Sequence, residues 1–589
     1  MNSIFRKTMI WLSVSSAVLF NYSCIEEVQP TDYASGKQIE QSSNAQEALL
    51  NGLVSFMVAY DTYGTSGGAN DWGYPCQMVM RDVMIEDFPV TFTKGNYDYF
   101  TVYEEGTDLR YNNEGYFYYA QIAHNANNII KACDTFDGAT DTDENATDSA
   151  MVYAGIGYAY RALAYFDMAR LYEFKRTGFA DLDAKASKVW GLTVPIVTEK
   201  TGLEESKHNP RAPFYTMYRF ILSDLNKAEA YLKNYARSGK ERPDASVVKA
   251  LKARFWLELA TRFDKSQDDL TAQLAHENDE DGYAALGISS AAECYENALN
   301  YAQEVIASGY SPVTKEQWYD KTTGFNTANQ AWIWMAKIGT KEQLSGYYYY
   351  SWMGTLNNEG DYTLGNYGTY RCIGKSLFDK IPDCDWRKTS WVAPADTNKT
   401  EVPAKYSTLI TGDKWKDLPP YVGLKFHTGG GSTDDYYTSH ICDIPMIRVE
   451  EMYFIAAEAK AHTQGLASGI AELESFVNTY RYTEDESGVL TPYTCQATDM
   501  DSFIDSLMVQ KRIELWGEGL VYFDYKRLGL AITRDYEGTN FYKNTRLNSL
   551  PGYVAPWLNY YLSEYENAYN PSVILNPDPS GVVEDTSDY

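Results

Sequence analysis

Cys24 is the residue whose position most directly predicts a chemical modification. A positive segment at positions 6–7 precedes the apolar run Met9–Phe20, and Ser23 places a small residue before the cysteine. The run of about 12 residues is well short of the roughly 20 that span a bilayer as a helix. We therefore expect residues 1–23 to be a cleaved lipoprotein signal peptide and Cys24 to carry acyl chains, palmitate included, that anchor the chain to a membrane. The alternative is an ordinary signal peptide followed by an incidental cysteine.

Acidic pairs are the only residues whose types would suit hydrolysis. Glu86-Asp87 and Glu450-Glu451 could supply the two carboxylates of a glycosidase, which must lie at a set separation across the sugar bond. The chain has 80 Asp and Glu residues, so such pairs arise easily by coincidence. None of the six histidines has the HExxH spacing, and no GxSxG segment is present. We expect no catalysis.

Two other segments approximate ligand-binding loops. Residues 141–145 (DTDEN) have the alternating oxygens of a calcium loop but lack its turn glycine and its final glutamate. Gly374–Ser376 (GKS) resembles the end of a phosphate loop, but the required upstream glycine is displaced by one residue. The eight cysteines include no CxxC pair. We therefore expect no metal site and no cofactor.

The composition points to a binding surface for neutral ligands. A net charge of −29 would repel nucleic-acid phosphates and anionic lipid headgroups. The chain contains 51 tyrosines and 13 tryptophans. Tyrosine combines a flat apolar face with a polar tip, which suits ligands that have ring faces and many hydroxyls, such as sugars. The alternative for any single tyrosine is that it packs helices together.

The elements that would position such residues are mostly helices. Apolar residues recur at spacings of three and four, and this predicts helices at Ala45–Tyr60, Tyr116–Cys133, Ala150–Tyr172, Phe214–Leu232, Ala245–Arg262, Ser290–Ser308, Arg448–Thr463, Ala467–Tyr480, Asp501–Trp516 and Leu520–Leu528. Small and large residues alternate in Ser290–Ser308, as in tetratricopeptide-type pairs, although the 34-residue period of such repeats is not clean.

The segment 310–444 lacks the helical pattern. It is rich in Gly, Tyr, Trp, Asp and Thr. A structureless stretch of this length is uncommon in a compact domain, so we expect short strands and ordered loops. Loops on a rigid scaffold are where binding residues usually lie.

Three segments together resemble the SusD/RagB family of Bacteroidetes outer-membrane lipoproteins. Residues 444–459 (IPMIRVEEMYFIAAEA) resemble the family helix IPLIRLAEMYLIRAEA, and residues 511–529 (KRIELWGEG…FDYKRLG) resemble RRIELxxEGxRxFDLKRxG. Residues 161–172 (RALAYFDMARLY) resemble RAxxYFxLvrlyG, and the acidic pair after Cys24 resembles the surface-export signal of such lipoproteins. The resemblance covers nearly the whole mature chain.

The charged residues of these motifs have a structural interpretation. They lie on predicted amphipathic helices beside large apolar residues, and we expect them to pair charges and pack helices instead of binding a ligand: Arg448, Glu458, Arg512, Glu514 and Asp524.

The resemblance implies a mainly α fold. It implies a SusD-like, TPR-like helical-repeat scaffold with a large loop-rich insertion containing short strands. The expected divisions are the signal peptide 1–23, a tether 24–44, and a single SusD-like body 45–589, in which TPR-like helices (45–309) are followed by the insertion (310–444), C-terminal helices (445–530) and an irregular tail (531–589).

The resemblance also implies a function. Such proteins are cell-surface, lipid-anchored proteins of the outer membrane that capture oligosaccharide or polysaccharide and deliver it to a SusC-like TonB-dependent transporter, without catalysis. Three alternatives remain: a peptide-capturing RagB-like protein, a surface glycoside hydrolase, and a helical-repeat scaffold that binds only protein.

In the family the ligand platform lies on two regions, which correspond here to about 71–103 and 346–371. From residue type within these regions, we expect stacking or hydrogen bonding by Trp72, Tyr74, Arg81, Tyr97, Asp98, Tyr99, Tyr347, Trp352, Tyr367 and Tyr370. The alternative for each of them is packing in the core.

Overall fold

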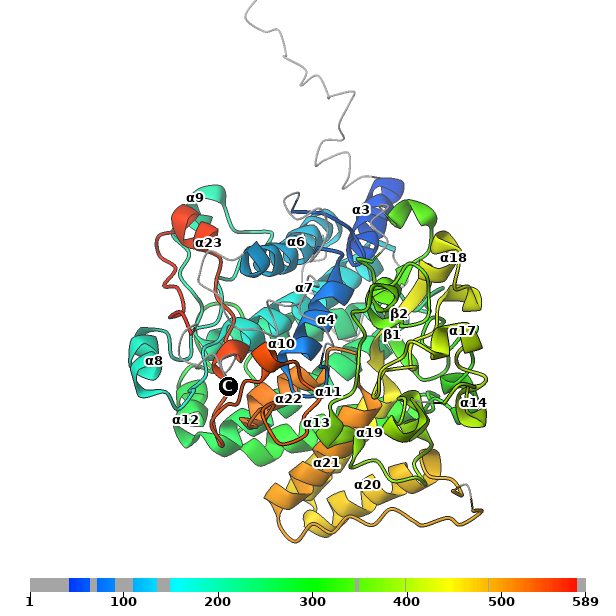
Figure 1. Ribbon diagram of the computed structural model, residues 1–589. Coiled ribbons are helices and arrows are strands. Elements are labelled where there is room, and N and C mark those ends of the chain that lie inside the picture. Colours follow the sequence, from blue (N-terminus) through cyan, green and yellow to red (C-terminus); the bar gives the residue numbers. More distant parts are fainter. Residues whose placement is uncertain are drawn as a thin grey trace, which may run out of the picture.

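Helices dominate the computed structural model, as the spacing of apolar residues predicts, and the mainly α fold is confirmed (Figure 1). The structure describes residues 42–63, 71–89, 110–134, 149–344, 349–397, 399–485 and 487–579. The predictions for Cys24, Tyr97, Asp98, Tyr99 and Tyr347, and for nearly all of the tether, lie outside these residues.

The N-terminal half consists of long helices that pack on their neighbours in chain order. Their bounds are α3 (Ser43–Phe56), α4 (Tyr74–Met84), α6 (Arg110–Cys133), α7 (Ser149–Tyr172), α10 (Phe214–Leu232), α11 (Ala245–Lys265), α12 (Gln267–Ala275) and α13 (Ala291–Ala307). Where the sequence predicts a helix, the observed bounds differ by a few residues or coincide. The first helix begins at Ser43, two residues before the predicted start of the body at position 45.

Helix α7 lies between α6 and α10 and is buried on nearly every side. Two glycines permit this approach. A Cβ on Gly155 would lie 2.8 Å from the Cβ of Tyr231 in α10, and one on Gly157 would lie 3.1 Å from a side-chain carbon of Ile130 in α6. Because real Cβ contacts are essentially never as short as 2.8 Å, Gly155 sets the spacing between α7 and α10.

Side-chain caps explain where several helices begin. Asp244 accepts a hydrogen bond from the Val247 amide at the start of α11, and Ser290 accepts one from Glu293 at the start of α13. Such caps satisfy backbone N–H groups that have no partner within the helix. Helix α13 ends at Gly309, as predicted, where a φ of +96° is accessible to glycine.

The insertion is closed at its base by two antiparallel strands, β1 (Trp332–Ile338) and β2 (Cys442–Arg448). Both strands are buried along most of their length. This pair confirms the prediction of short strands. Figure 1 places the insertion on the right, beside the helical repeats.

Four helices follow the insertion: α19 (Val449–Thr463), α20 (Leu466–Tyr480), α21 (Met500–Glu514) and α22 (Val521–Leu528). Helix α19 packs against α13, and thereby joins the C-terminal helices to the repeats. The remaining described helices are one or two turns long: α8 (Ala180–Lys185), α9 (Leu203–Ser206), α14 (Lys315–Trp318), α15 (Trp352–Leu356), α16 (Lys375–Phe378), α17 (Gly412–Trp415), α18 (Tyr436–His440) and α23 (Glu564–Tyr569).

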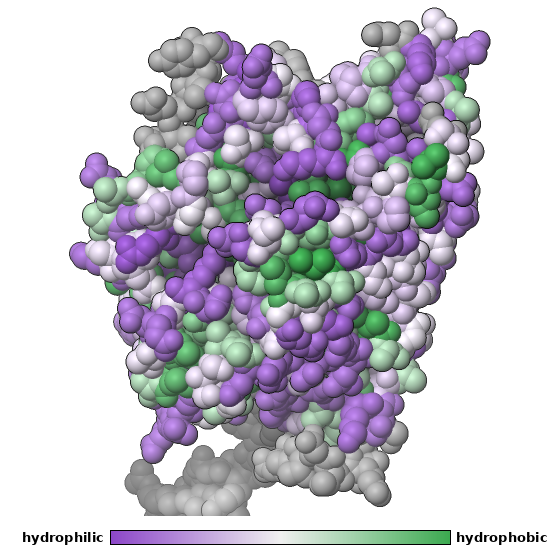
Figure 2. Space-filling view, turned by 90° about the horizontal axis from the view of Figure 1, so that it is seen from below, coloured by the Kyte–Doolittle hydropathy of each residue, from purple (hydrophilic) through white to green (hydrophobic). Residues whose placement is uncertain are grey.

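One large hydrophobic cluster runs through the molecule, from Leu50 in α3 to Val573 near the C-terminus. On the face shown in Figure 2, hydrophilic residues predominate and hydrophobic ones form small, separate patches. This distribution is typical of a surface in contact with water.

Candidate functional site

Six tyrosines of the insertion gather around α15 and α18, and we call this group the tyrosine face: Tyr349, Tyr350, Tyr362, Tyr367, Tyr436 and Tyr437. Tyr367 is 59% exposed and Tyr437 is 49% exposed. The other rings are half-buried, except Tyr436, which is buried at the base of the group. The tyrosine face therefore has outward rings held from below by inward ones.

The rings support one another edge to face. The centroid of Tyr349 lies 4.3 Å from that of Tyr367, at an interplanar angle of 71°. Tyr362 lies 5.7 Å from Tyr436, and Tyr436 lies 5.1 Å from Tyr437. Such pairs contribute about 0.5–1.5 kcal/mol each beyond the area they bury, so the exposed rings have restricted positions.

The backbone beneath the tyrosine face is held by short turns. Tyr367 ends the 3₁₀ turn η3 (Gly365–Tyr367), and the chain leaves it through Gly368 at a φ of +84°. Asp435 accepts a hydrogen bond from the Tyr437 amide at the start of α18. His440 Nε2 lies 3.1 Å from the carbonyl oxygen of Tyr362, which joins the two segments.

Polar groups surround the exposed rings. Lys414 Nζ lies 2.6 Å from a carboxylate oxygen of Asp361 and 3.1 Å from the amide oxygen of Asn366, next to Tyr367. Exposed carboxylates and amides beside tyrosine rings can exchange hydrogen bonds with hydroxyl groups of a ligand. Among the described residues, no three His, Cys, Asp or Glu side chains are placed to hold a metal ion.

The sequence-predicted residues divide between the surface and the interior. Tyr367 is on the tyrosine face, and Tyr370 is half-buried nearby in the chain, where burial raises the pKa of its hydroxyl. Trp72 is 4% exposed and lines a small cavity together with Tyr350 and Tyr436, so it supports the face from inside.

Tyr74, Arg81 and Trp352 lie in the core, where a ligand ring could not stack on them. The Tyr74 hydroxyl donates to Asp167 at 2.8 Å, and Arg81 donates to the same carboxylate at 3.1 Å and to the Gly519 carbonyl at 2.8 Å. Trp352 is fully buried against Phe426. For these three and for Trp72, packing is the role that the structure shows.

Sequence reasoning did not identify five of the six tyrosines of the face. Tyr349 and Tyr350 belong to the same four-tyrosine run as Tyr347, and the Tyr436-Tyr437 pair follows the Gly- and Asp-rich segment 429–435. The sequence signal that could have identified them is a pair of adjacent tyrosines beside turn-forming residues, because turns place neighbouring side chains at the surface.

Charged residues of the C-terminal motifs form a network in the interior together with charged residues from outside the motifs. It comprises four cations and four anions, each at most 1% exposed: Arg387, Lys425, Arg448, Arg481, Asp385, Glu450, Glu514 and Glu518. Glu514 accepts hydrogen bonds from Arg387 at 2.9 Å, Arg448 at 3.1 Å and Arg481 at 2.7 Å. Burial by itself would raise the pKa of Glu514, but the three guanidinium groups outweigh it and hold that pKa well below its usual range.

Other motif charges also pair inside the molecule. Arg527 donates to Glu458 at 2.6 Å, Lys511 to Asp524 at 2.9 Å, and Arg512 Nε to Asp87 at 2.7 Å. The structural interpretation of Arg448, Glu458, Arg512, Glu514 and Asp524 is confirmed.

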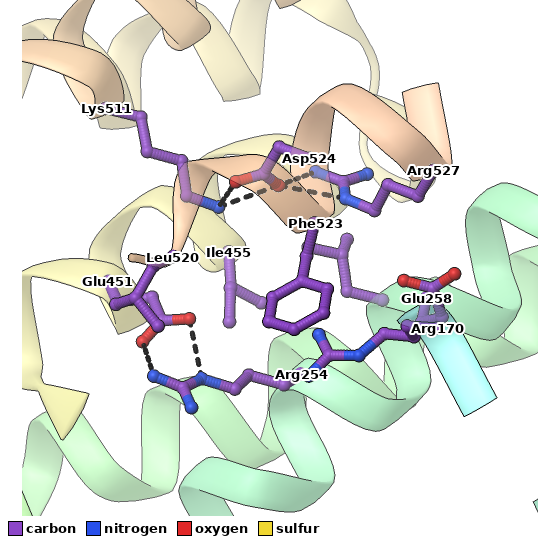
Figure 3. A pocket seen from close by; sticks show the side chains of 11 residues that line it. Arg170, Arg254, Glu258, Glu451, Ile455, Lys511, Leu520, Phe523, Asp524 and Arg527 are labelled. Carbon is purple, nitrogen blue, oxygen red and sulfur yellow. Dashed lines mark hydrogen bonds and ion pairs between the residues drawn. The ribbon is translucent and has the colours of Figure 1, made fainter. Parts of the chain in front are cut away.

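A small internal cavity lies among these helices (Figure 3). Dashed lines in the figure join Lys511 and Arg527 to Asp524, and Arg254 to Glu451. The cavity has a volume of about 30 Å³, room for about two water molecules. It is too small for a sugar ring. The acidic pairs considered for hydrolysis are engaged similarly, since Asp87, Glu450 and Glu451 are all buried and ion-paired.

Comparison with known proteins identifies a family and a fold. Residues 311–585 match the family model described as the SusD family. A SusD-like carbohydrate-binding protein from Bacteroides vulgatus has the same fold, with a TM-score of 0.62 and 18% identity over 90% of this chain and 97% of its own. Residues 311–585 therefore match the SusD family, and the chain as a whole has the fold of SusD-like proteins.

Further SusD-family structures agree. A SusD superfamily protein from Bacteroides thetaiotaomicron has a TM-score of 0.58 at 18% identity, over 91% of this chain and 99% of its own. One from Parabacteroides distasonis has a TM-score of 0.60 at 17% identity, over 90% and 98%. No curated protein matches this chain. Within its described residues, no helix has both the length and the apolar character needed to cross a membrane.

Proposed function

We propose that this protein captures glycans at the cell surface and binds them without cleaving them. The observation that carries the proposal is the tyrosine face, two of whose rings are about half exposed or more on a rigid base. Aromatic side chains are apolar platforms with polar tips, which suits the alternating ring faces and hydroxyls of a saccharide. One protein of the same fold is described as carbohydrate-binding.

Anchoring and delivery are further parts of the proposal. Acylation at Cys24 would hold the body at the outer membrane, since two or more acyl chains give stable attachment. A SusC-like TonB-dependent transporter would then receive the captured oligosaccharide. Support for both comes from the signal-peptide pattern before Cys24 and from the match to the SusD family.

Affinity electrophoresis of the mature chain through a panel of polysaccharides tests the capture step, with reducing-sugar release measured in parallel. We expect retardation by at least one polysaccharide without release of sugar. The double variant Tyr367→Ala/Tyr437→Ala should migrate as in a gel without glycan. Tyr569→Ala is the matched control, because Tyr569 is 78% exposed and lies on α23, on the other side of Figure 1 from α18. Release of sugar would overturn the non-catalytic part of the proposal, and retardation of the double variant would move the site elsewhere.

A further inference from the structure

A second cleft lies between the end of α11, α12 and the segment 550–554, and we call it the tail cleft. Its volume is about 620 Å³, enough for a saccharide ring with its substituents. Figure 1 shows α12 and α18 on opposite sides of the molecule, so the tail cleft is separate from the tyrosine face.

Glu258, on α11, lies at the inner wall of the tail cleft and has an unusual environment. The residue is 8% exposed, and none of the described residues gives its carboxylate a hydrogen bond or an ion pair. In Figure 3 no dashed line reaches Glu258, whereas Glu451 and Asp524 are both paired. Burial raises the pKa of this carboxyl, against the opposing positive charges of Arg170, Lys175 and Arg527.

Burying a carboxylate is costly unless hydrogen bonds compensate for the lost water, and Glu258 can gain such bonds from the cleft that it lines. Glu173, in the same cleft, shows the ordinary solution, since Arg262 donates to it twice at 2.8 Å. Glu258 lacks such a partner and faces the cleft, so hydrogen-bond donors placed in the cleft would satisfy it.

The outer wall of the tail cleft is aromatic. Tyr553 is 42% exposed, and its ring lies against Gly178, where an added Cβ would be 2.8 Å from the ring. Trp190 is half-buried, in edge-to-face contact with Phe174 at 5.7 Å, and the guanidinium of Arg176 lies 4.9 Å from its ring. The wall is therefore held in place and partly open to solvent.

We propose that the tail cleft is a second saccharide subsite, in which a sugar ring packs on Tyr553 and its hydroxyls donate hydrogen bonds to Glu258. This inference rests on the proposed function. The lining of the cleft includes cations, such as Arg176 and Lys265, and anions, such as Glu258 and Asp268. A ligand of either charge would therefore meet like charge, whereas neutral hydroxyls would not. Two subsites on opposite sides would let one molecule hold two segments of a polysaccharide.

Titration calorimetry of the mature chain with maltotriose, xylotriose, cellotriose and mannotriose tests the inference, because each is too short to reach both sites. We expect one of these trisaccharides to bind with a stoichiometry of two. Tyr553→Ala should weaken the second site by about 30-fold and reduce the measured stoichiometry to one. Glu258→Gln, which keeps the shape but removes the charge, should weaken the same site by about tenfold.

Two controls and two contrary outcomes distinguish failure of the second subsite from failure of the proposed function. Tyr569→Ala, again the matched exposed tyrosine, should keep both sites, and unchanged thermal unfolding of each variant should show that the fold is intact. Binding at a single site that Tyr553→Ala leaves unchanged but Tyr367→Ala/Tyr437→Ala abolishes would overturn the tail cleft and leave the proposed function standing. Absence of binding by the parent to every trisaccharide and every polysaccharide would overturn both.

Discussion

The buried ion network and the tyrosine face differ in what they reveal to a reader of the sequence. Network residues such as Arg448 and Glu514 lie in recognisable motifs and are fully buried. The tyrosine face lies in the segment without motifs, and its outward rings are exposed. The motifs therefore record how helices are held together, whereas the proposed ligand surface has no fixed pattern. This contrast predicts that changes in the network alter folding and changes on the face alter binding.

The largest expected effect comes from Glu514→Ala. This change leaves Arg387, Arg448 and Arg481 without a shared carboxylate in the interior, and breaking a buried ion pair costs about 3–5 kcal/mol. Urea denaturation followed by circular dichroism measures the loss. Asp505→Ala is the control on the same helix, because Asp505 is exposed, and its effect should stay within about 0.5 kcal/mol. Equal effects from the two variants would contradict the assigned role of the network.

His427 gives the next largest effect, through pH. Burial, helped by nearby Lys321, lowers the pKa of His427 to about 4, whereas the unfolded chain has the ordinary value of 6.5. Between these values the unfolded state binds a proton that the native state does not, so stability falls as pH falls from 6.5 to 4. The loss from this group is roughly 3 kcal/mol.

Parallel urea titrations of the parent and of His427→Gln at pH 7, 6, 5 and 4 isolate this contribution. The difference between their free energies of unfolding should change by roughly 3 kcal/mol across the window, because other acidic groups cancel. A constant difference would show that His427 does not titrate as a buried neutral group.

Gly155→Ala tests how closely α7 packs against α10 within the helical scaffold. The added methyl would lie 2.8 Å from Tyr231, and overpacking of this kind costs typically about 1–3 kcal/mol. Gly52→Ala in α3 is the matched control, because nothing lies within 4 Å of its added Cβ. That change should stabilise the protein by up to about 1 kcal/mol, since alanine favours helix over glycine. Thermal unfolding distinguishes the two, and a stabilised Gly155→Ala variant would contradict the packing of α7.

The smallest effect on stability per substitution is expected for Tyr367→Ala/Tyr437→Ala. Both rings are about half exposed or more, so each truncation loses little buried area but removes one ring–ring pair, and it should change the free energy of unfolding by about 0.5–1.5 kcal/mol. Loss of an aromatic anchor should nevertheless cost about 2 kcal/mol or more in glycan binding. Chemical denaturation and affinity electrophoresis on the same samples measure both quantities. A large loss of stability with unchanged binding would instead assign the tyrosine face, like the ion network, to folding.

Helix positions were predictable from sequence because apolar periodicity is local. Phe214–Leu232 coincides with its prediction, and the ends of α13 follow from Ser290 and Gly309. The pairing of β1 with β2 was not predictable in register, because its partners lie about 100 residues apart and nothing local selects them. Nor could sequence separate Tyr367 at the surface from Tyr74 in the core, since the same side chain suits both places and only tertiary packing decides between them.

The two strands at the base of the insertion have a consequence for variation within the fold. All six tyrosines of the face lie between Ile338 and Cys442, the residues paired at the open end of the β1–β2 ladder. A loop closed in this way can gain or lose residues at a small entropic cost, since that cost grows only with the logarithm of loop length. The helical scaffold can thus remain constant while the enclosed segment varies as a unit. Replacing the corresponding segment of another protein of this fold with residues 339–441 should therefore transfer the ligand preference.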